Sequence, residues 1–301
     1  MEPDSHLTYA EPGPMTVLGH HTDLLAGLPD DPGELRRIVQ GVMLHVFWAS
    51  AYGVTDDQLA PRRGELEIRC ASHMLDRIRE LDDRPLTAAR EPLRKLVGNC
   101  RDFSVLLTAL LRHKGIPARA RCGFGRYFTP GKHEDHWVTE VWRADEGRWT
   151  LTDAQLDEVQ VDTLQVTFDP LDVPRDEFVT GPLAWLQCRA GEADPATFGI
   201  GDMWGLWFVR GNVVRDIAAL NKMELLPWDC WGVIDEDGAD DNAEALALLD
   251  HAARLAAMGD ASLDELQALY ASEPRLRVPP SVTSYGDGTP RPVALSEHIV
   301  T

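Results

Sequence analysis

The segment Gly98–Arg119, GNCRDFSVLLTALLRHKGIPAR, has the best-defined local pattern in this chain. Asn99 is a residue type that favours the N-terminal cap of a helix. The apolar residues after it recur at the spacing of one helical face. They are Phe103, Leu106, Leu107, Leu110 and Leu111. The segment Gly115–Pro117 ends this pattern. The stretch therefore predicts a buried helix over residues 99–113.

Three strands are predicted after this helix. Residues 118–124 alternate small or apolar side chains with two arginines, which is typical of a strand. Residues 136–142 and 148–153 have a similar pattern, and the short polar segment between them predicts a hairpin. Periodicity predicts further helices, which cover residues 34–52, 64–80, 176–188, 239–258 and 262–270. The fold class is therefore α+β, with an antiparallel sheet packed on the helix that begins at Cys100.

The composition excludes several classes of partner and environment. The chain has 301 residues, and 29 Lys+Arg against 49 Asp+Glu give a net charge of −20. This charge repels phosphate backbones, so no nucleic-acid partner is expected. No apolar run is long enough to span a membrane, and residues 1–14 lack the apolar core of a signal peptide. The five cysteines are scattered, which favours reduced thiols and a cytoplasmic location.

Cys100 is the candidate nucleophile. It lies in the first turn of the predicted helix, where backbone N–H groups and the helix dipole lower the pKa of a thiol. The thiolate is the reactive form of cysteine. Taken alone, however, a cysteine is more often a small buried apolar side chain.

The predicted hairpin supplies a base and a carboxylate. If its turn is centred between Ala144 and Asp145, His136 faces Asp153 across the two strands. Asp153 would then orient the imidazole and stabilise its charged form. The same face would carry Val138, Glu140, Trp142, Trp149 and Leu151. His133 and His136 could instead bind a metal, but they lack HExxH spacing, and no Cys or third His is near them in the sequence. We therefore expect neither a metal nor a cofactor.

These segments resemble the core of the transglutaminase-like superfamily over about residues 95–157. The resemblance is carried by the helix opening at Cys100, the Gly-Ile-Pro-Ala-Arg turn at residues 115–119, the strand starting His136-Trp137 and the strand reaching Asp153. The chain departs from the family because no small residue separates His136 from Trp137. The resemblance implies a circularly permuted, papain-like Cys-His-Asp thiol enzyme. In it Cys100 is the nucleophile, His136 the base and Asp153 the orienting carboxylate.

An acyl-enzyme mechanism also requires an oxyanion hole and a substrate pocket. The backbone N–H of Cys100 is one natural donor, and the indole N–H of Trp48 is a candidate for the second, although the sequence favours a core position for Trp48. Trp137, which follows the candidate base, is a further weak pocket candidate. Trp228 and Trp231 could line a pocket for an apolar acyl group or plug the core.

Composition and the resemblance together predict four parts of the chain. Residues 1–30 form a loose lead-in, 31–160 the transglutaminase-like catalytic core, 161–272 a Trp-rich helical extension packed on it, and 273–301 a Pro-rich tail. The function expected is hydrolysis of a small-molecule or peptide acyl substrate, as by an amidase or peptidase. Two alternatives stay open: an acyltransferase that uses an amine acceptor in a biosynthetic pathway, and a non-catalytic interaction module on the same fold.

Overall fold

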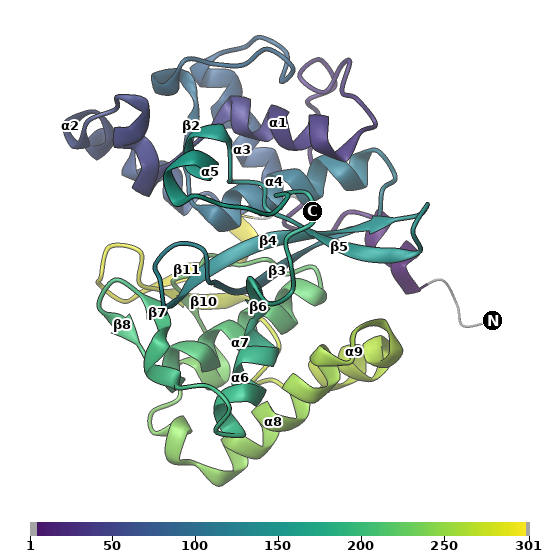
Figure 1. Ribbon diagram of the computed structural model, residues 1–301, viewed down its shortest axis with the longest axis vertical. Helices are drawn as coiled ribbons and strands as arrows, with labels where there is room; N and C mark the ends of the chain where they lie inside the picture. Colours follow the sequence, from purple (N-terminus) through teal and green to yellow (C-terminus); the bar gives the residue numbers. More distant parts are fainter. Residues whose placement is uncertain (1–4, 299–301) are drawn as a thin grey trace. The chain divides into compact units, whose positions relative to one another are not determined.

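The computed structural model describes residues 5–298, which form two compact units (Figure 1). Of the described residues, unit 1 contains 5–6, 120–137 and 174–297, and unit 2 contains 7–119, 138–173 and 298. The strands β3 (Ala118–Gly125) and β4 (His133–Arg143) each have residues in both units. Residues 1–4 of the expected lead-in and 299–301 of the expected tail lie outside the described residues.

Unit 2 is built on three helices that share an apolar core. α1 (Pro32–Val42) and α3 (Ala71–Leu81) both pack against α4 (Cys100–His113). α4 agrees with the predicted helix, and the predicted apolar face is buried in this core, where Leu106 and Leu110 are 0% exposed. The shorter helical elements of unit 2 are η2 (Val46–Tyr52), α2 (Asp56–Leu59), η3 (Ala60–Glu67), η4 (Pro92–Arg94) and α5 (Glu158–Leu164), and η1 (Ser5–Ala10) has residues in both units.

The predictions for residues 34–52 and 64–80 were wrong in part. α1 ends at Val42, and Met43–His45 form the strand β1, which pairs in parallel with β2 (Leu96–Gly98). A short apolar run that is buried on both faces has no periodicity that separates strand from helix. Farther along, Ile68–Cys70 separate η3 from α3, so that prediction covers two elements.

The β4–β5 hairpin forms in a different register from the predicted one. β5 covers Arg148–Thr152, and Val141 pairs with Thr150 rather than with Arg148. The turn is longer because Gly147 adopts φ 65° and closes a four-residue loop, with its N–H bonded to Arg143 O at 2.8 Å. The prediction that His136 directly faces Asp153 is therefore wrong: Thr152 pairs with Thr139, three residues beyond His136.

Because the shift is by an even number of residues, the predicted cross-strand face is retained. Glu140 lies opposite Leu151, and Trp142 lies opposite Trp149 with ring centroids 5.5 Å apart. Glu140 accepts a hydrogen bond from Arg119 Nε at 2.7 Å, and this guanidinium lies 4.1 Å from the Trp149 ring centroid. The buried carboxylate is thus neutralised by an arginine that the aromatic rings hold in place.

Unit 1 contains a mixed sheet. Among the described residues its strand order is β6-β3-β4-β7-β8. β5 pairs with the residues of β4 that belong to unit 2. β7 (Phe198–Ile200) pairs with β4 in parallel, so the expectation of a purely antiparallel sheet was wrong. The long segment between the two strands, which includes α6, gives the chain enough length to return to the same end. The remaining strands are β6 (Phe178–Thr180) and β8 (Met203–Trp204).

The helices of unit 1 pack together, and α7 (Leu206–Leu220) is central, because it contacts both α6 and α8. The predicted helices near residues 176, 239 and 262 begin later than expected, as α6 (Gly181–Arg189), α8 (Ala243–Ala257) and α9 (Leu263–Ser272). Shorter helical elements are η5 (Pro195–Thr197), η6 (Gly232–Ile234), η7 (Ala239–Asp241), η8 (Gly259–Ser262) and η9 (Leu295–Glu297).

Both ends of the described chain are more ordered than the sequence suggested. In the expected loose lead-in, Tyr9 and Met15 are 0% exposed. In the expected extended tail, β10 (Ser281–Ser284) pairs with both β9 (Asp229–Cys230) and β11 (Arg291–Ala294). A few apolar anchors in otherwise polar segments are enough to hold them, although their spacing gives no regular pattern.

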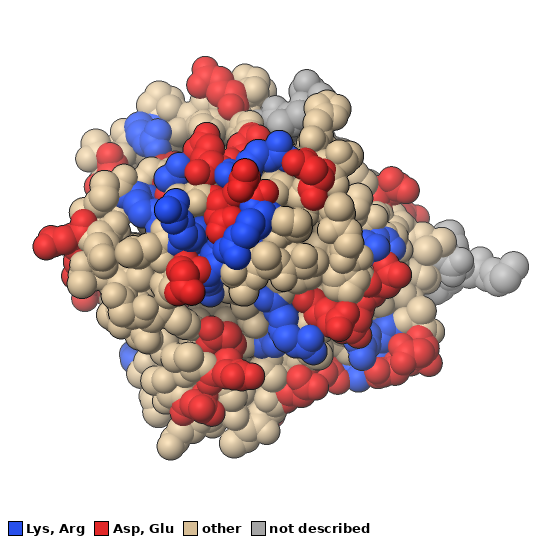
Figure 2. All heavy atoms as spheres, turned by 90° about the horizontal axis from the view of Figure 1, so that it is seen from above, with Lys and Arg blue, Asp and Glu red and all other residues tan. Residues whose placement is uncertain are grey.

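Acidic and basic side chains are interspersed on the face shown in Figure 2. In unit 2, basic side chains likewise lie beside acidic ones near the surface, with Arg84 2.6 Å from Asp82 and Arg77 2.9 Å from Glu80. The acidic excess of the chain therefore does not form one patch on that face. No helix within residues 5–298 combines the length and apolar character needed to cross a membrane.

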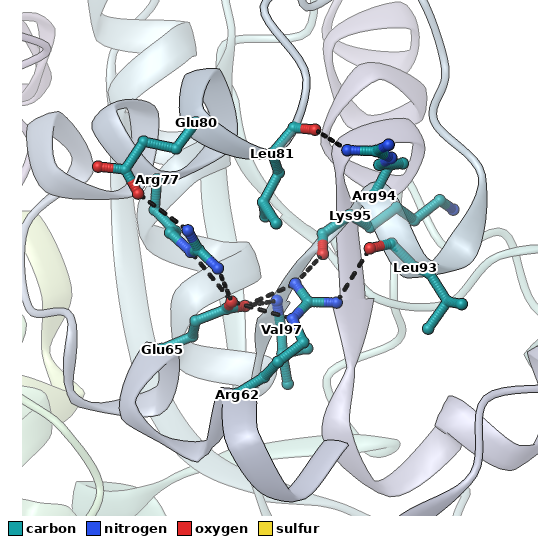
Figure 3. A network of polar contacts seen from close by, with 9 residues as sticks. All are labelled: Arg62, Glu65, Arg77, Glu80, Leu81, Leu93, Arg94, Lys95 and Val97. Carbon is teal, nitrogen blue, oxygen red and sulfur yellow. Dashed lines mark hydrogen bonds and ion pairs between the residues drawn. The ribbon is translucent and has the colours of Figure 1, made fainter. Parts of the chain in front are cut away.

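A buried carboxylate holds the strand that leads to α4 (Figure 3). Glu65 is 7% exposed, and its Oε2 accepts the backbone N–H of Val97 in β2 at 2.8 Å. Arg62 binds both carboxylate oxygens, at 3.0 and 2.7 Å, and also donates to Lys95 O. Arg77 adds two hydrogen bonds to Oε1. Glu65 thus supplies the hydrogen-bond acceptor for one edge of β2, and two guanidinium groups balance its charge.

Replacing Glu65 with glutamine is expected to lower the free energy of unfolding by about 2–4 kcal/mol, because two partly buried guanidinium groups lose their carboxylate. Urea unfolding measures this change. The matched control is Glu80→Gln, because Glu80 is a solvent-exposed partner of Arg77, and it should change stability by less than about 0.5 kcal/mol. Equal effects of the two substitutions would contradict the role assigned to Glu65.

Replacing Gly123 with alanine is expected to destabilise unit 1. A Cβ at this position in β3 would lie 2.3 Å from Val179 O in β6, which is backbone and cannot move aside. The expected cost is about 2–4 kcal/mol. Gly64→Ala is the control, because nothing lies within 4 Å of its added Cβ. Thermal unfolding of both variants checks the prediction, and a Gly123→Ala protein as stable as the control would refute it.

Candidate functional site

Cys100 is the first residue of α4, and Asn99 caps that helix. The Oδ1 atom of Asn99 accepts the backbone N–H groups of Arg101 at 2.9 Å and Asp102 at 3.3 Å. Cys100 is 8% exposed, so the residue is largely shielded from water. The cap therefore fixes the thiol at the positive end of the helix dipole, where a thiolate is favoured.

Asp102 completes a reciprocal cap at the same turn. Its Oδ2 accepts the backbone N–H of Asn99 at 2.9 Å, and its Oδ1 accepts from Arg101 Nη1 at 3.0 Å. Burial raises the pKa of the Asp102 carboxyl, and the adjacent Arg101 guanidinium opposes that shift. The backbone on both sides of Cys100 is therefore held by side chains of its own turn.

The parallel strands β1 and β2 end side by side. His45 at the end of β1 pairs with Gly98 at the end of β2, so η2 and α4 both begin near this end of the two strands. The His45 ring lies 6.0 Å from the Phe103 ring of α4 and 5.7 Å from Phe47, which is 72% exposed. Trp48, the predicted oxyanion donor, is half-buried in η2.

Asp153 directly follows β5 and is 0% exposed. Its Oδ1 accepts the backbone N–H groups of Gln155 at 2.8 Å and Leu156 at 3.1 Å. From α1, Arg36 Nε donates to Asp153 O at 2.7 Å, and Gln40 Nε2 donates to Leu156 O at 3.1 Å. The carboxylate thus sits in a short turn that is clamped to α1.

His136 lies in the part of β4 that belongs to unit 1, and it is 1% exposed. Three aromatic rings of that unit surround the imidazole, with centroid distances of 4.9 Å to Phe128, 5.8 Å to Tyr127 and 6.3 Å to Phe178. Phe128 and Tyr127 belong to the loop after β3. Gly125 allows this loop to fold back, because a Cβ there would lie 2.7 Å from the Phe128 ring. The contacts restrict the imidazole to a narrow range of orientations.

His133 does not form a metal pair with His136. The two residues are three apart in one strand, so their side chains point to opposite faces. The His133 ring stacks on Phe198 at a centroid distance of 4.1 Å, and its Nδ1 lies 3.2 Å from Thr197 Oγ1. Within residues 5–298, no three His, Cys, Asp or Glu side chains are grouped as metal ligands.

The other predicted pocket residues have different environments in unit 1. Trp137 is 0% exposed, and its Nε1 has no hydrogen-bond partner among the described residues. Trp231 is buried and donates its indole N–H to Leu276 O at 3.0 Å, as a core plug would. Trp228 is partly buried, and its backbone oxygen accepts the N–H of Tyr285 at 3.0 Å.

Unit 2 also has a small polar cavity. Its lining includes His45, Tyr52, Gln155 and Gln160, and it has space for about one water molecule. Tyr52 Oη donates to Asp157 at 2.6 Å, and burial together with this bond raises the pKa of the phenol. The cavity is therefore a polar support for the segment after Asp153 and is too small for an acyl substrate.

Sequence reasoning missed several residues that support these side chains. Glu65, Arg36 and Gln40 act through contacts with segments far away in the chain, and no local pattern marks such contacts. Phe128 had a local signal, since an aromatic pair follows Gly125 in a polar loop shortly before the candidate base.

Solved structures give a distant likeness. A chain from Cytophaga hutchinsonii described as a "Putative Cysteine Protease" matches with 17% sequence identity and a TM-score of 0.33. The match covers 59% of this chain and 46% of that one, so it spans less than half of the other protein. No curated protein matches the chain.

A family model gives the clearer result. It matches residues 55–154, which include α4, β3, β4 and β5. The matched segment begins upstream of the region in which the sequence motifs lie and contains Cys100, His136 and Asp153. The resemblance seen in the sequence is therefore confirmed: residues 55–154 of this chain match the transglutaminase-like superfamily.

Proposed function

We propose that this protein is a papain-like thiol enzyme that forms an acyl-enzyme on Cys100. His136 is the base and Asp153 the orienting carboxylate, in the circularly permuted arrangement that the superfamily match implies. The observation that carries the proposal is the position of Cys100 as the first residue of a capped helix inside the matched segment. A helix start favours the thiolate, which is the attacking species.

The environments of the two partner residues support their roles. Asp153 is held by two backbone N–H groups and by α1, so its carboxylate is fixed in place. His136 lies in β4, the strand whose later residues pair with β5. β5 in turn ends one residue before Asp153. A fixed carboxylate keeps an imidazole in one tautomer and stabilises its protonated form.

The proposed reaction has two stages, acylation of Cys100 and hydrolysis of the acyl-enzyme. Cys100 Sγ attacks the carbonyl carbon of an amide, ester or thioester, and the leaving group departs with a proton from His136. The resulting thioester is then attacked by water, whose proton His136 accepts, and a carboxylic acid and the free thiolate are released. Substrates are small-molecule or peptide acyl compounds, and we place hydrolysis first. An amine in place of water would give an amide, and product analysis with added amines separates the two outcomes.

We place this reaction in the cytoplasm. None of the five cysteines forms a disulfide within the part of the chain that the structure describes, and three of them, Cys70, Cys100 and Cys122, are buried. A reducing compartment keeps thiols in this state, so the pattern supports the expectation drawn from the sequence.

The test is alkylation of individual cysteines with iodoacetamide between pH about 5 and 9, followed by peptide mass spectrometry. Cys100 is expected to react at least about tenfold faster than the other thiols near pH 6. Cys188 is the internal reference, because burial and Asp194 raise its pKa to about 11. Burial also raises the pKa of Cys230.

His136→Ala should remove the rapid reaction of Cys100 at low pH and leave Cys188 unchanged. In a parallel assay, Cys100→Ala should abolish ester turnover. If Cys100 reacts at the rate of an ordinary thiol in both proteins, the triad is not functional, and the non-catalytic interaction module becomes the better account.

A further inference from the structure

Asn99, the residue that directly precedes the proposed nucleophile in the chain, carries a buried amide nitrogen. The residue is 6% exposed, and its Nδ2 has no hydrogen-bond partner among residues 5–298. Its orientation is set by the cap, in which the other atom of the amide faces the N–H groups of Arg101 and Asp102. Backbone N–H groups are donors, so the atom that faces them is the oxygen and the unpartnered atom is the nitrogen.

The cap itself does not require this nitrogen. Ser, Thr and Asp cap helices through a side-chain oxygen about as well as Asn does. Asn242 caps α8 with the same contacts, since its Oδ1 accepts the N–H groups of Glu244 at 2.9 Å and Ala245 at 3.2 Å. Asn242, however, is exposed, so water can satisfy its amide. Buried donors without a partner are rare because they are unfavourable. The amide of Asn99 therefore calls for a role that the cap does not explain.

We propose that Asn99 Nδ2 is an oxyanion-hole donor for the reaction at Cys100. When Sγ bonds to the substrate carbonyl carbon, the π electron pair moves to the oxygen, which becomes negative. The Nδ2–H group hydrogen-bonds this oxygen without transferring its proton. When the leaving group departs with the proton from His136, the C=O bond forms again. The inference rests on the proposed function and assigns a second donor beside the Cys100 backbone N–H.

The position of Asn99 suits this role electrostatically. Nδ2 is bonded to the same carbon as the capping Oδ1, so it lies over the first turn of α4, at the positive end of the helix dipole. The capping box fixes the side chain before substrate arrives, and burial shields it from water. A donor that is held in place in this way stabilises charge in the transition state without reorganisation.

Two reactions at the same thiol separate this role from a structural one. Acylation of Cys100 by p-nitrophenyl acetate passes through an oxyanion. Alkylation by iodoacetamide displaces iodide and has no such intermediate. Asn99→Ser keeps an oxygen for the cap and removes the amide nitrogen. We expect its acylation rate to fall about 10²-fold, as for loss of one oxyanion donor, while its alkylation rate stays within about threefold of wild type.

Asn99→Asp is the second variant, because Asp also caps helices and places an oxygen where Nδ2 stood. Acylation should fall at least as far as in Asn99→Ser. Asn242→Ser is the matched control, since it makes the same change at the cap of α8, and it should alter neither rate. Iodoacetamide also reports whether each variant still presents a folded, reactive Cys100.

The outcomes are distinct. Loss of acylation with retained alkylation in the Asn99 variants supports the inference. Unchanged acylation overturns it and leaves the proposed function standing. Equal loss of both rates overturns it too, because Asn99 would then act through the fold or the thiolate. If wild-type Cys100 is alkylated rapidly but never acylated, the proposed function fails, and the inference fails with it.

Discussion

The first turn of α4 must satisfy its own backbone N–H groups and at the same time present Cys100. Asn99 and Asp102 meet the first requirement with a reciprocal cap. Glu65 plays a similar part just before the helix, because its carboxylate accepts the backbone N–H of Val97 in the strand that leads into α4. The supports on either side of Cys100 are thus polar groups buried in unit 2, and they hold the backbone that carries the thiol.

The other proposed catalytic groups depend on similar local constraints. Asp153 is fixed by the turn after β5 and by Arg36 of α1. His136 is fixed within unit 1 by the aromatic rings of the loop after β3. Asp153 is therefore oriented by the turn after a strand and by a contact distant in sequence, whereas His136 is oriented by rings of the loop that precedes its strand. This design is expected for a site in which the fold, and not the substrate, sets the geometry.

Local signals in the sequence predicted α4, its cap, β3 and the two strands of the hairpin. The hairpin register was wrong because Gly147 lengthens the turn, a choice that residue spacing alone does not reveal. β1 was taken for helix because a buried strand of three residues carries no period. α7 was missed because both of its faces are buried, so its pattern is not amphipathic. The parallel pairing of β7 with β4 depends on a long-range return of the chain. For the site, the residue types around Cys100 indicated the family, whereas the triad and the pocket residues stay predictions.

We propose that Cys100 exists as a thiolate paired with the imidazolium of His136. The ultraviolet absorbance of the thiolate, measured against pH as the difference between wild type and Cys100→Ser, tests it most directly. We expect a thiolate signal that persists down to pH about 6 or below in wild type and is lost there in His136→Ala. A signal that appears only near pH 8.5, as for an unperturbed thiol, in both proteins would contradict it.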